Sequence, residues 1–212
     1  MRKFGVNVQG RVKNYSLPEH KSLMPLFEAV VNSIQSIYEA KKVDGKIDIY
    51  IEREKTISDE IIGKIENIVI TDNGIGFNDD NFNSFMESDS EYKKDFGGKG
   101  VGRFSWLKAF EKAEIDSIFI NGDKTFKRAF VFSVDNHFID ESPVLTDETD
   151  VKTRVKLCGF KVAYQKEAPL YLEKIAVKLI QHCLAYFFSK DCPKIIISDS
   201  LGDCINVNEI FT

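Results

Sequence analysis

A run of apolar residues ends in an acid and two glycines, a combination that could hold a flat aromatic ligand. In Ile68–Phe77, a β-rich stretch leads to Asp72, and glycines follow at positions 74 and 76. A carboxylate accepts hydrogen bonds from an exocyclic amine, and a glycine lets a planar ring approach the backbone closely. These properties suit an adenine ring. A tight turn at Asp72–Gly74 with no ligand is the alternative interpretation.

A second glycine-rich segment has the composition of a phosphate-binding loop. Gly97–Phe104 contains four glycines and leads directly into an apolar pattern with helical spacing. Backbone amides and the positive end of a helix dipole bind anions such as phosphates, and Lys99 adds a mobile cation. The segment lacks the Gly-Lys-Ser/Thr of a Walker loop and does not follow a strand in a βαβ unit. A flexible hinge or lid with no ligand is the alternative.

Two polar residues interrupt an otherwise apolar stretch closer to the N-terminus. Glu28 and Asn32 are four residues apart, so on a helix the carboxylate and the carboxamide lie on one face, one turn apart. Polar groups among core-facing residues need a partner. Taken alone, the pair is also typical of a solvated helix edge.

The acid and the amide of this pair are expected on one long helix. Apolar residues recur at three- and four-residue spacing over Ser22–Ala40, which predicts an amphipathic helix with Ser22 as its N-cap. A short extended segment is expected before it, around Phe4–Val8. Alternation predicts a strand over Lys46–Arg53, and a β-rich run predicts another over Ile65–Thr71. The two strands are expected to pair as a hairpin.

The remaining elements complete one domain of mixed structure. Strands are expected over Ile115–Ile120, Thr125–Val134, Thr153–Leu157 and Lys194–Ser198, a short helix from about Gly102, and a long helix over Leu170–Phe188. Regular βαβ alternation is missing, so we expect an α/β two-layer sandwich, with a mixed, mainly antiparallel sheet and helices on one face. No repeat or linker divides residues 1–212, which favours a single domain.

Composition excludes several classes of protein. Hydrophobic residues make up 43% and charged residues 29%, which is typical of a globular chain. The net charge of -4 argues against a protein whose whole surface binds nucleic acid. No apolar run could span a membrane, and no secretory signal is present, so we expect a cytoplasmic protein with four free thiols. A metal site is disfavoured because no Cys-x-x-Cys is present. Its residues would be His182, Cys183, Cys192 and Cys204.

The three motifs together resemble the GHKL superfamily of ATPases, which share the Bergerat fold. The order is a helix with an acid and an amide, a strand with Asp-x-Gly-x-Gly, a glycine-rich loop entering a helix, and a strand with Thr153. The superfamily includes DNA gyrase, the ninety-kilodalton heat-shock chaperones, bacterial histidine kinases and MutL. The resemblance covers Leu23–Leu157 by motif. The layout is most similar to the N-terminal nucleotide domains of the chaperones and of MutL-type ATPases.

The resemblance implies a role for each site residue. Glu28 matches the general base that activates the attacking water, and Asn32 matches the amide that holds Mg²⁺. Asp72 matches the residue that recognises adenine, and Thr153 matches the hydroxyl that shares a water with it. The other implied contacts to ATP are Gly74, Gly76, Gly98, Lys99, Gly100, Val101, Gly102 and Arg103.

The implied function is ATP binding with slow, Mg²⁺-dependent hydrolysis that acts as a conformational or dimerisation switch. We expect ATP to promote a homodimer. We also expect the chain to be the N-terminal module of a larger protein, whose other regions bind a protein or nucleic-acid client. Two alternatives stay open. Phosphoryl transfer to a histidine lacks an upstream hairpin, since only His20 precedes the fold. A non-catalytic nucleotide-binding scaffold would leave Glu28 without a role.

Overall fold

A single mixed sheet runs through almost all of the chain that the computed structural model describes, residues 8–58, 61–86, 102–135, 139–140 and 142–211. Its nine strands are β1 (Lys46–Arg53), β2 (Ile65–Asp72), β3 (Phe110–Asn121), β4 (Lys124–Ser133), β5 (Ile139–Asp140), β6 (Val144–Leu145), β7 (Lys152–Phe160), β8 (Lys194–Asp199) and β9 (Cys204–Asn206). The described helical segments are α1 (Val8–Asn14), the 3₁₀ turn η1 (Glu19–Lys21), α2 (Met24–Glu39), α3 (Asp79–Met86), α4 (Arg103–Ala109), α5 (Val162–Gln165), α6 (Leu172–His182), α7 (Leu184–Phe187) and α8 (Val207–Phe211).

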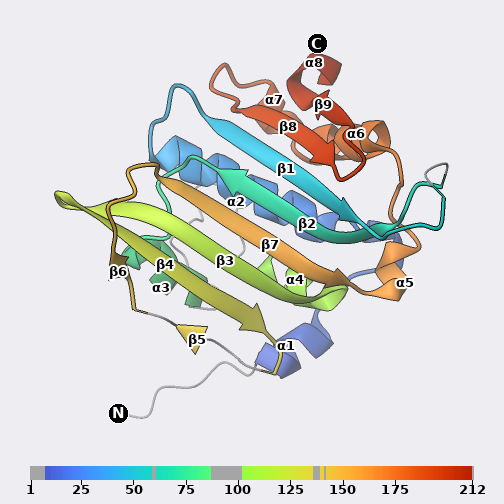
Figure 1. Ribbon diagram of the computed structural model, residues 1–212, viewed down its shortest axis with the longest axis horizontal. Coiled ribbons are helices and arrows are strands. Elements are labelled where there is room, and N and C mark those ends of the chain that lie inside the picture. The colour runs from blue at the N-terminus through green and yellow to red at the C-terminus, as the bar shows by residue number, and fades with distance from the viewer. Residues whose placement is uncertain (1–7, 59–60, 87–101, 136–138, 141, 212) are drawn as a thin grey trace.

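The strand order is β5-β4-β3-β7-β2-β1-β8-β9, with β6 also paired to β4. Among the described strand pairs, β1 and β8 run parallel and the others run antiparallel. Figure 1 shows α2, α4 and α6 behind the sheet, while no described helix crosses the face turned toward the viewer. The predicted α/β arrangement, with a mainly antiparallel sheet covered on one face, is therefore confirmed.

The strands that carry the site form where the sequence predicted them, although β3 begins at Phe110 instead of Ile115 and β7 ends at Phe160 instead of Leu157. In β1, Ile47, Ile49 and Ile51 are at most 1% exposed and face the helices. β2 pairs with β1 as the predicted antiparallel hairpin, and it ends at Asp72. Since β7 pairs with the other side of β2, the end of β2 lies between two neighbouring strands. The aspartate is therefore held inside the sheet.

Helix α2 packs an apolar stripe against this part of the sheet. Leu26, Val30 and Ile34 are fully buried, as their spacing predicts. Its start differs from the prediction, because the N-cap is Leu23 and no side chain caps the helix. Ser22 instead lies between the turn η1 and the helix, and it is 2% exposed. The predicted N-cap was therefore wrong, because Ser22 is the C-cap of η1 and already has helical backbone angles before α2 begins.

The predicted C-terminal helix over 170–188 is in fact two helices. The backbone leaves helical geometry at Cys183, with φ -99° and ψ 18°, and this residue separates α6 from α7. Apolar residues continue with nearly helical spacing across the break: Leu179 and Phe187 are both buried. The periodic pattern therefore could not reveal the break.

Two further differences concern the N-terminal part and the short elements. Val8 begins α1, so the predicted extended segment does not include it, while Phe4–Asn7 lies outside the described residues. The short elements that the sequence did not predict are α1, η1, α3, α5, α8, β5, β6 and β9. None of the described helices has the length and the hydrophobicity that a bilayer crossing requires.

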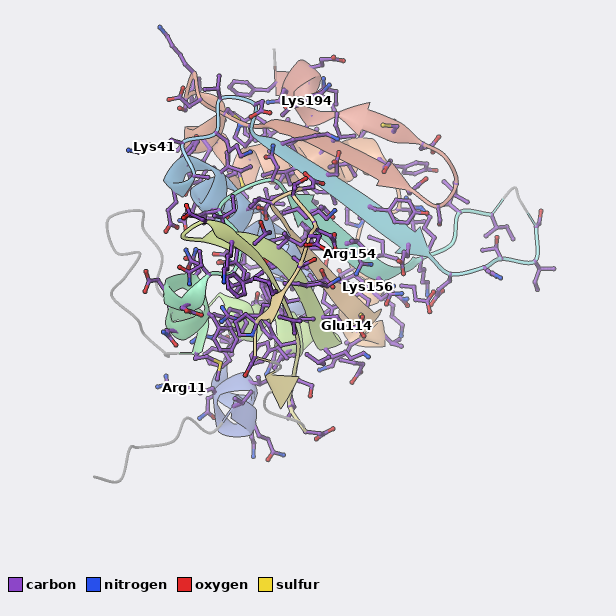
Figure 2. All side chains as sticks on the ribbon, turned by 60° about the vertical axis from the view of Figure 1, so that its left-hand side comes forward. Arg11, Lys41, Glu114, Arg154, Lys156 and Lys194 are labelled. Atoms are coloured by element: carbon purple, nitrogen blue, oxygen red, sulfur yellow. The ribbon has the colours of Figure 1, made fainter. Side chains whose placement is uncertain are left out.

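The uncovered sheet face carries charged side chains of both signs. Glu114 and Lys156 are register partners on β3 and β7, and Figure 2 shows them beside Arg154 on this face. Lys156 Nζ also lies 2.8 Å from a carboxylate oxygen of Glu52. Interspersed charges of this kind keep a one-sided sheet hydrated.

Candidate functional site

Asp72 is held in a fixed orientation at the end of β2. Its side chain is buried, with the residue 4% exposed. Ser33 Oγ of α2 donates to Asp72 Oδ2 at 2.8 Å, and the Gly74 amide donates to Oδ1 at 2.9 Å. An ionised carboxylate accepts hydrogen bonds and donates none. The helix and the turn together therefore present a rigid acceptor.

The turn after Asp72 is docked directly on α2. The Ile75 amide donates to both the side-chain and the main-chain oxygen of Ser36, at 3.1 and 3.2 Å. At Gly74, a Cβ atom would lie 2.2 Å from Ser36 Oγ and 2.7 Å from the Ser36 carbonyl carbon. Because the helix backbone cannot retreat from such a contact, only glycine fits at position 74.

Gly76 is required by its close approach to β3. Its φ is +83°, and a Cβ atom would lie 2.7 Å from Phe119 Cβ and 2.8 Å from the Ile118 carbonyl oxygen. These atoms belong to β3. The position that a side chain would take at Gly76 thus faces a strand of the sheet.

Replacing Gly76 by alanine is expected to destabilise the fold more than replacing Gly122. Both glycines have positive φ, which costs an L-residue about 1–2 kcal/mol. Only Gly76 also meets neighbouring atoms, since a Cβ at Gly122 has nothing within 4 Å; overpacking adds about 1 kcal/mol or more. Urea unfolding of both variants measures the difference. Equal losses would contradict the close approach to β3.

Thr153 lies beside Asp72, and its hydroxyl contacts the hydroxyl of Ser117. The two residues are register partners on β7 and β2, and Thr153 is also the partner of Ser117 on β3. The Thr153 and Ser117 hydroxyls are 2.9 Å apart, and Ser117 Oγ accepts a hydrogen bond from the Phe77 amide at 2.9 Å. Ser117 therefore ties the predicted Thr153 to the backbone just after Gly76.

Glu28 lies on the same helix at the other end of the site. It is partly buried, and burial raises the pKa of its carboxyl above the ordinary value of 4.5. Gly102, the N-cap of α4, lies against it: a Cβ at position 102 would be 2.2 Å from Glu28 Oε2. The structure therefore brings the predicted acid to the end of the glycine-rich segment.

The other predicted residues are distributed unevenly. Asn32 is exposed on α2, directly before Ser33. Arg103 is buried: its guanidinium carbon lies 5.1 Å from the Phe85 ring centroid, and Nη1 donates to the Ser84 carbonyl at 3.4 Å. This side chain is thus directed at α3. Four predicted loop contacts lie outside the described residues, namely Gly98, Lys99, Gly100 and Val101.

Sequence reasoning missed three serines that organise the site: Ser33, Ser36 and Ser117. Their partners lie 35 to 40 residues away along the chain, so no local pattern identifies them. A signal was present only on the helix, where two of the serines occur on a face that otherwise packs against the sheet. Hydroxyls at such positions need partners.

The alternative metal site near the C-terminus gains no support. Among the described residues, no group of three His, Cys, Asp or Glu side chains is arranged to hold a metal ion. All four cysteines are free, as predicted. Burial, with smaller effects of Cys192 and Glu28, raises the pKa of Cys183 to about 12. This thiol is therefore protonated at neutral pH and a poor metal ligand.

Comparison with known families and proteins identifies no relative, since no family model and no curated protein matches the chain. The chemistry of the site therefore has to follow from its own residues. These residues are Asp72, a buried carboxylate beside the hydroxyl groups of Ser33 and Thr153, and Glu28, a carboxylate with a raised pKa. Helix α2 connects them, because it carries Glu28 and also Ser33, which bonds to Asp72.

Proposed function

We propose that the chain is an ATP-binding and ATP-hydrolysing domain of the GHKL type with a Bergerat fold. One observation carries this proposal: helix α2 contacts both candidate halves of a nucleotide site. Ser33 and Ser36 hold Asp72 and the turn after it, while Glu28 lies against Gly102. A single rigid element thus joins an acceptor suited to adenine with an acid suited to activating water.

The acceptor side suits adenine bound through its 6-amino group. Asp72 offers carboxylate oxygens, which pair with that amino group, and a guanine bound in the same orientation would place its 6-oxo group against them. Thr153 supplies a hydroxyl next to this carboxylate, oriented by Ser117. Groups of this kind reject a ligand that leaves them unpaired.

The hydrolytic side combines Glu28 with Asn32. The raised pKa of Glu28 makes its carboxylate a stronger base toward water. Asn32 is exposed one turn further along the helix, and no described residue bonds to its side chain, so its amide oxygen fits the oxygen donors that Mg²⁺ prefers. Bound Mg²⁺ would neutralise charge on the phosphates. Asn32 would hold the ion, and Glu28 would take the proton of the attacking water.

The proposed biological role is that of a switch. A site that relies on positioning and charge stabilisation, with one base, is suited to slow turnover. ATP binding would then favour one conformation or a homodimer, and hydrolysis would release it. A protein or nucleic-acid client, bound by regions outside this chain, is part of the same proposal.

Calorimetry and phosphate release test the proposal directly. We expect ATP to bind to the full chain more tightly with Mg²⁺ than without it, and GTP to bind at least about tenfold more weakly, since one missing hydrogen bond to a charged group costs about 1.5–3 kcal/mol. Phosphate release is expected to be slower than the roughly 10 s⁻¹ typical of enzymes. Absence of ATP binding by the folded chain would overturn the proposal.

A further inference from the structure

The backbone at position 102 does not itself require glycine. Gly102 has φ -55° and ψ -37°, a right-handed helical conformation that any L-residue adopts. The restriction comes from Glu28. A Cβ atom on Gly102 would lie 2.2 Å from Oε2, 2.8 Å from Cδ and 3.3 Å from Cγ of that side chain. No other residue is among the three nearest atoms, so the conflict is with the acid alone.

Gly102 cannot move away easily, because its carbonyl is held by the helix that follows. Ser105 Oγ donates to the Gly102 carbonyl at 2.6 Å, and the Ser105 amide donates to it at 2.9 Å. Ser105 is fully buried. The far end of α4 is fixed as well, since Lys161 Nζ donates to the Leu107 carbonyl at 2.7 Å. On its C-terminal side, the position of Gly102 is therefore set by α4.

The Glu28 side chain, in contrast, has no polar partner to fix it. No hydrogen bond or ion pair joins it to any other part of the chain that the structure describes. Its Cα is fixed by α2, whose neighbouring residues Phe27 and Ala29 are buried. Packing therefore decides where the carboxylate lies, and Gly102 is one of the contacts. Tyr15 and Cys183 are also close, since their pKa values are raised by burial and, to a smaller degree, by the Glu28 charge.

We propose that Gly102 is a positioning residue for Glu28: the fixed start of α4 sets the place of the carboxylate, and position 102 lacks a side chain so that the acid can occupy it. This inference rests on the proposed function and deepens it. A methyl group at position 102 must displace Oε2 by about 1 Å to reach an ordinary contact of 3.4 Å. Misplacement of a reacting group by about 1 Å costs on the order of 100-fold in rate.

A double-mutant cycle tests the contact without relying on catalysis. The full chain is compared with Gly102→Ala, Glu28→Ala and the double variant by thermal unfolding. Because the helical backbone at position 102 accepts alanine, Gly102→Ala is expected to raise Tm or leave it unchanged when Glu28 is alanine. When Glu28 is present, the added methyl must displace the carboxylate, so the Tm of Gly102→Ala is expected to be lower than that by roughly 2–4 °C. Gly122→Ala is the control, because its added Cβ meets nothing within 4 Å. Its effect on Tm should be the same in both backgrounds.

Kinetics on the same proteins test the positioning role. Gly102→Ala is expected to lower kcat for ATP roughly 100-fold with little change in KM, while Gly122→Ala keeps both values. Equal Tm changes for Gly102→Ala in the two backgrounds would overturn the contact. An unchanged kcat in an active chain would overturn the positioning role. A coupled cycle in a chain that neither binds nor hydrolyses ATP would support the contact and overturn the proposed function instead.

Discussion

Glu28→Ala is expected to bind ATP as the unmodified chain does and to release phosphate roughly 10²–10⁴-fold more slowly, the usual contribution of a general base. Binding survives because Asp72 is held by Ser33 and Gly74, and neither contact involves Glu28. Calorimetry measures the affinity, and single-turnover phosphate release measures the chemical step. Together they separate the loss of a base from the loss of the site.

Glu39→Ala provides the matched control for this variant. Glu39 is the last residue of the same helix and is exposed. Its replacement by alanine removes one negative charge from α2, as Glu28→Ala does, but leaves the site intact. Its rate is expected to equal that of the unmodified chain. Phosphate release by Glu28→Ala at that same rate would show that another group, or none, acts as the base.

The raised pKa of Glu28 gives this prediction a pH dependence. The base acts when ionised, so the rate should rise with pH around a midpoint above the ordinary value of 4.5. Stability should change in the opposite direction. The folded chain binds this proton more tightly than the unfolded chain, so this group's contribution to stability falls as pH rises from 4.5 through the raised pKa. Glu28→Gln removes that fall, which unfolding at pH 4 and pH 7 would detect.

Asp72→Asn is expected to weaken ATP binding by roughly 100- to 1,000-fold, because a charge-assisted hydrogen bond is lost and a donor then faces the amino group of the base. The substitution keeps the size of the side chain. Its oxygen can still accept from the Gly74 amide, and the Ser33 hydroxyl can turn to accept from the new amide. Folding is therefore affected much less than binding.

Asp48→Asn is the control. Asp48 lies on the uncovered face of β1, the strand that pairs with β2, which carries Asp72. Its affinity for ATP should be unchanged. Circular dichroism establishes that both variants are folded, and calorimetry with ATP and GTP measures the selectivity between the bases. An Asp72→Asn chain that binds ATP normally would exclude this carboxylate as the adenine acceptor.

The sequence predicted those parts of the fold that depend on local periodicity. The alternation Ile47, Ile49, Ile51 gave the exact bounds of β1, because each apolar side chain had to face the helices. The same reasoning failed at Cys183, where the apolar pattern continues although the backbone turns. It also failed at Ser22, a residue type common at N-caps that is buried before the helix instead.

The site was predictable only as far as residue types and motif order allow. Asp72 and Thr153 were singled out, and the pairing of β2 with β7 does place them side by side. The bonds of Ser33 and Ser117 depend on distant segments meeting, which no local pattern records. The contact of Gly102 with Glu28 was unpredictable for the same reason, since it is set by how α4 packs on α2.

The use of a single helix for both halves of the site makes its residue count matter as much as its residue types. Each residue of an α-helix advances about 1.5 Å and turns about 100°, so Glu28 and Ser33 are separated by a set distance and a set angle. Inserting or deleting one residue between them would turn one group away from the site while leaving a normal helix. Helix α2 thus sets the spacing between the two halves of the site. We expect functional variants of this helix to carry substitutions between Glu28 and Ser33, and no insertions or deletions.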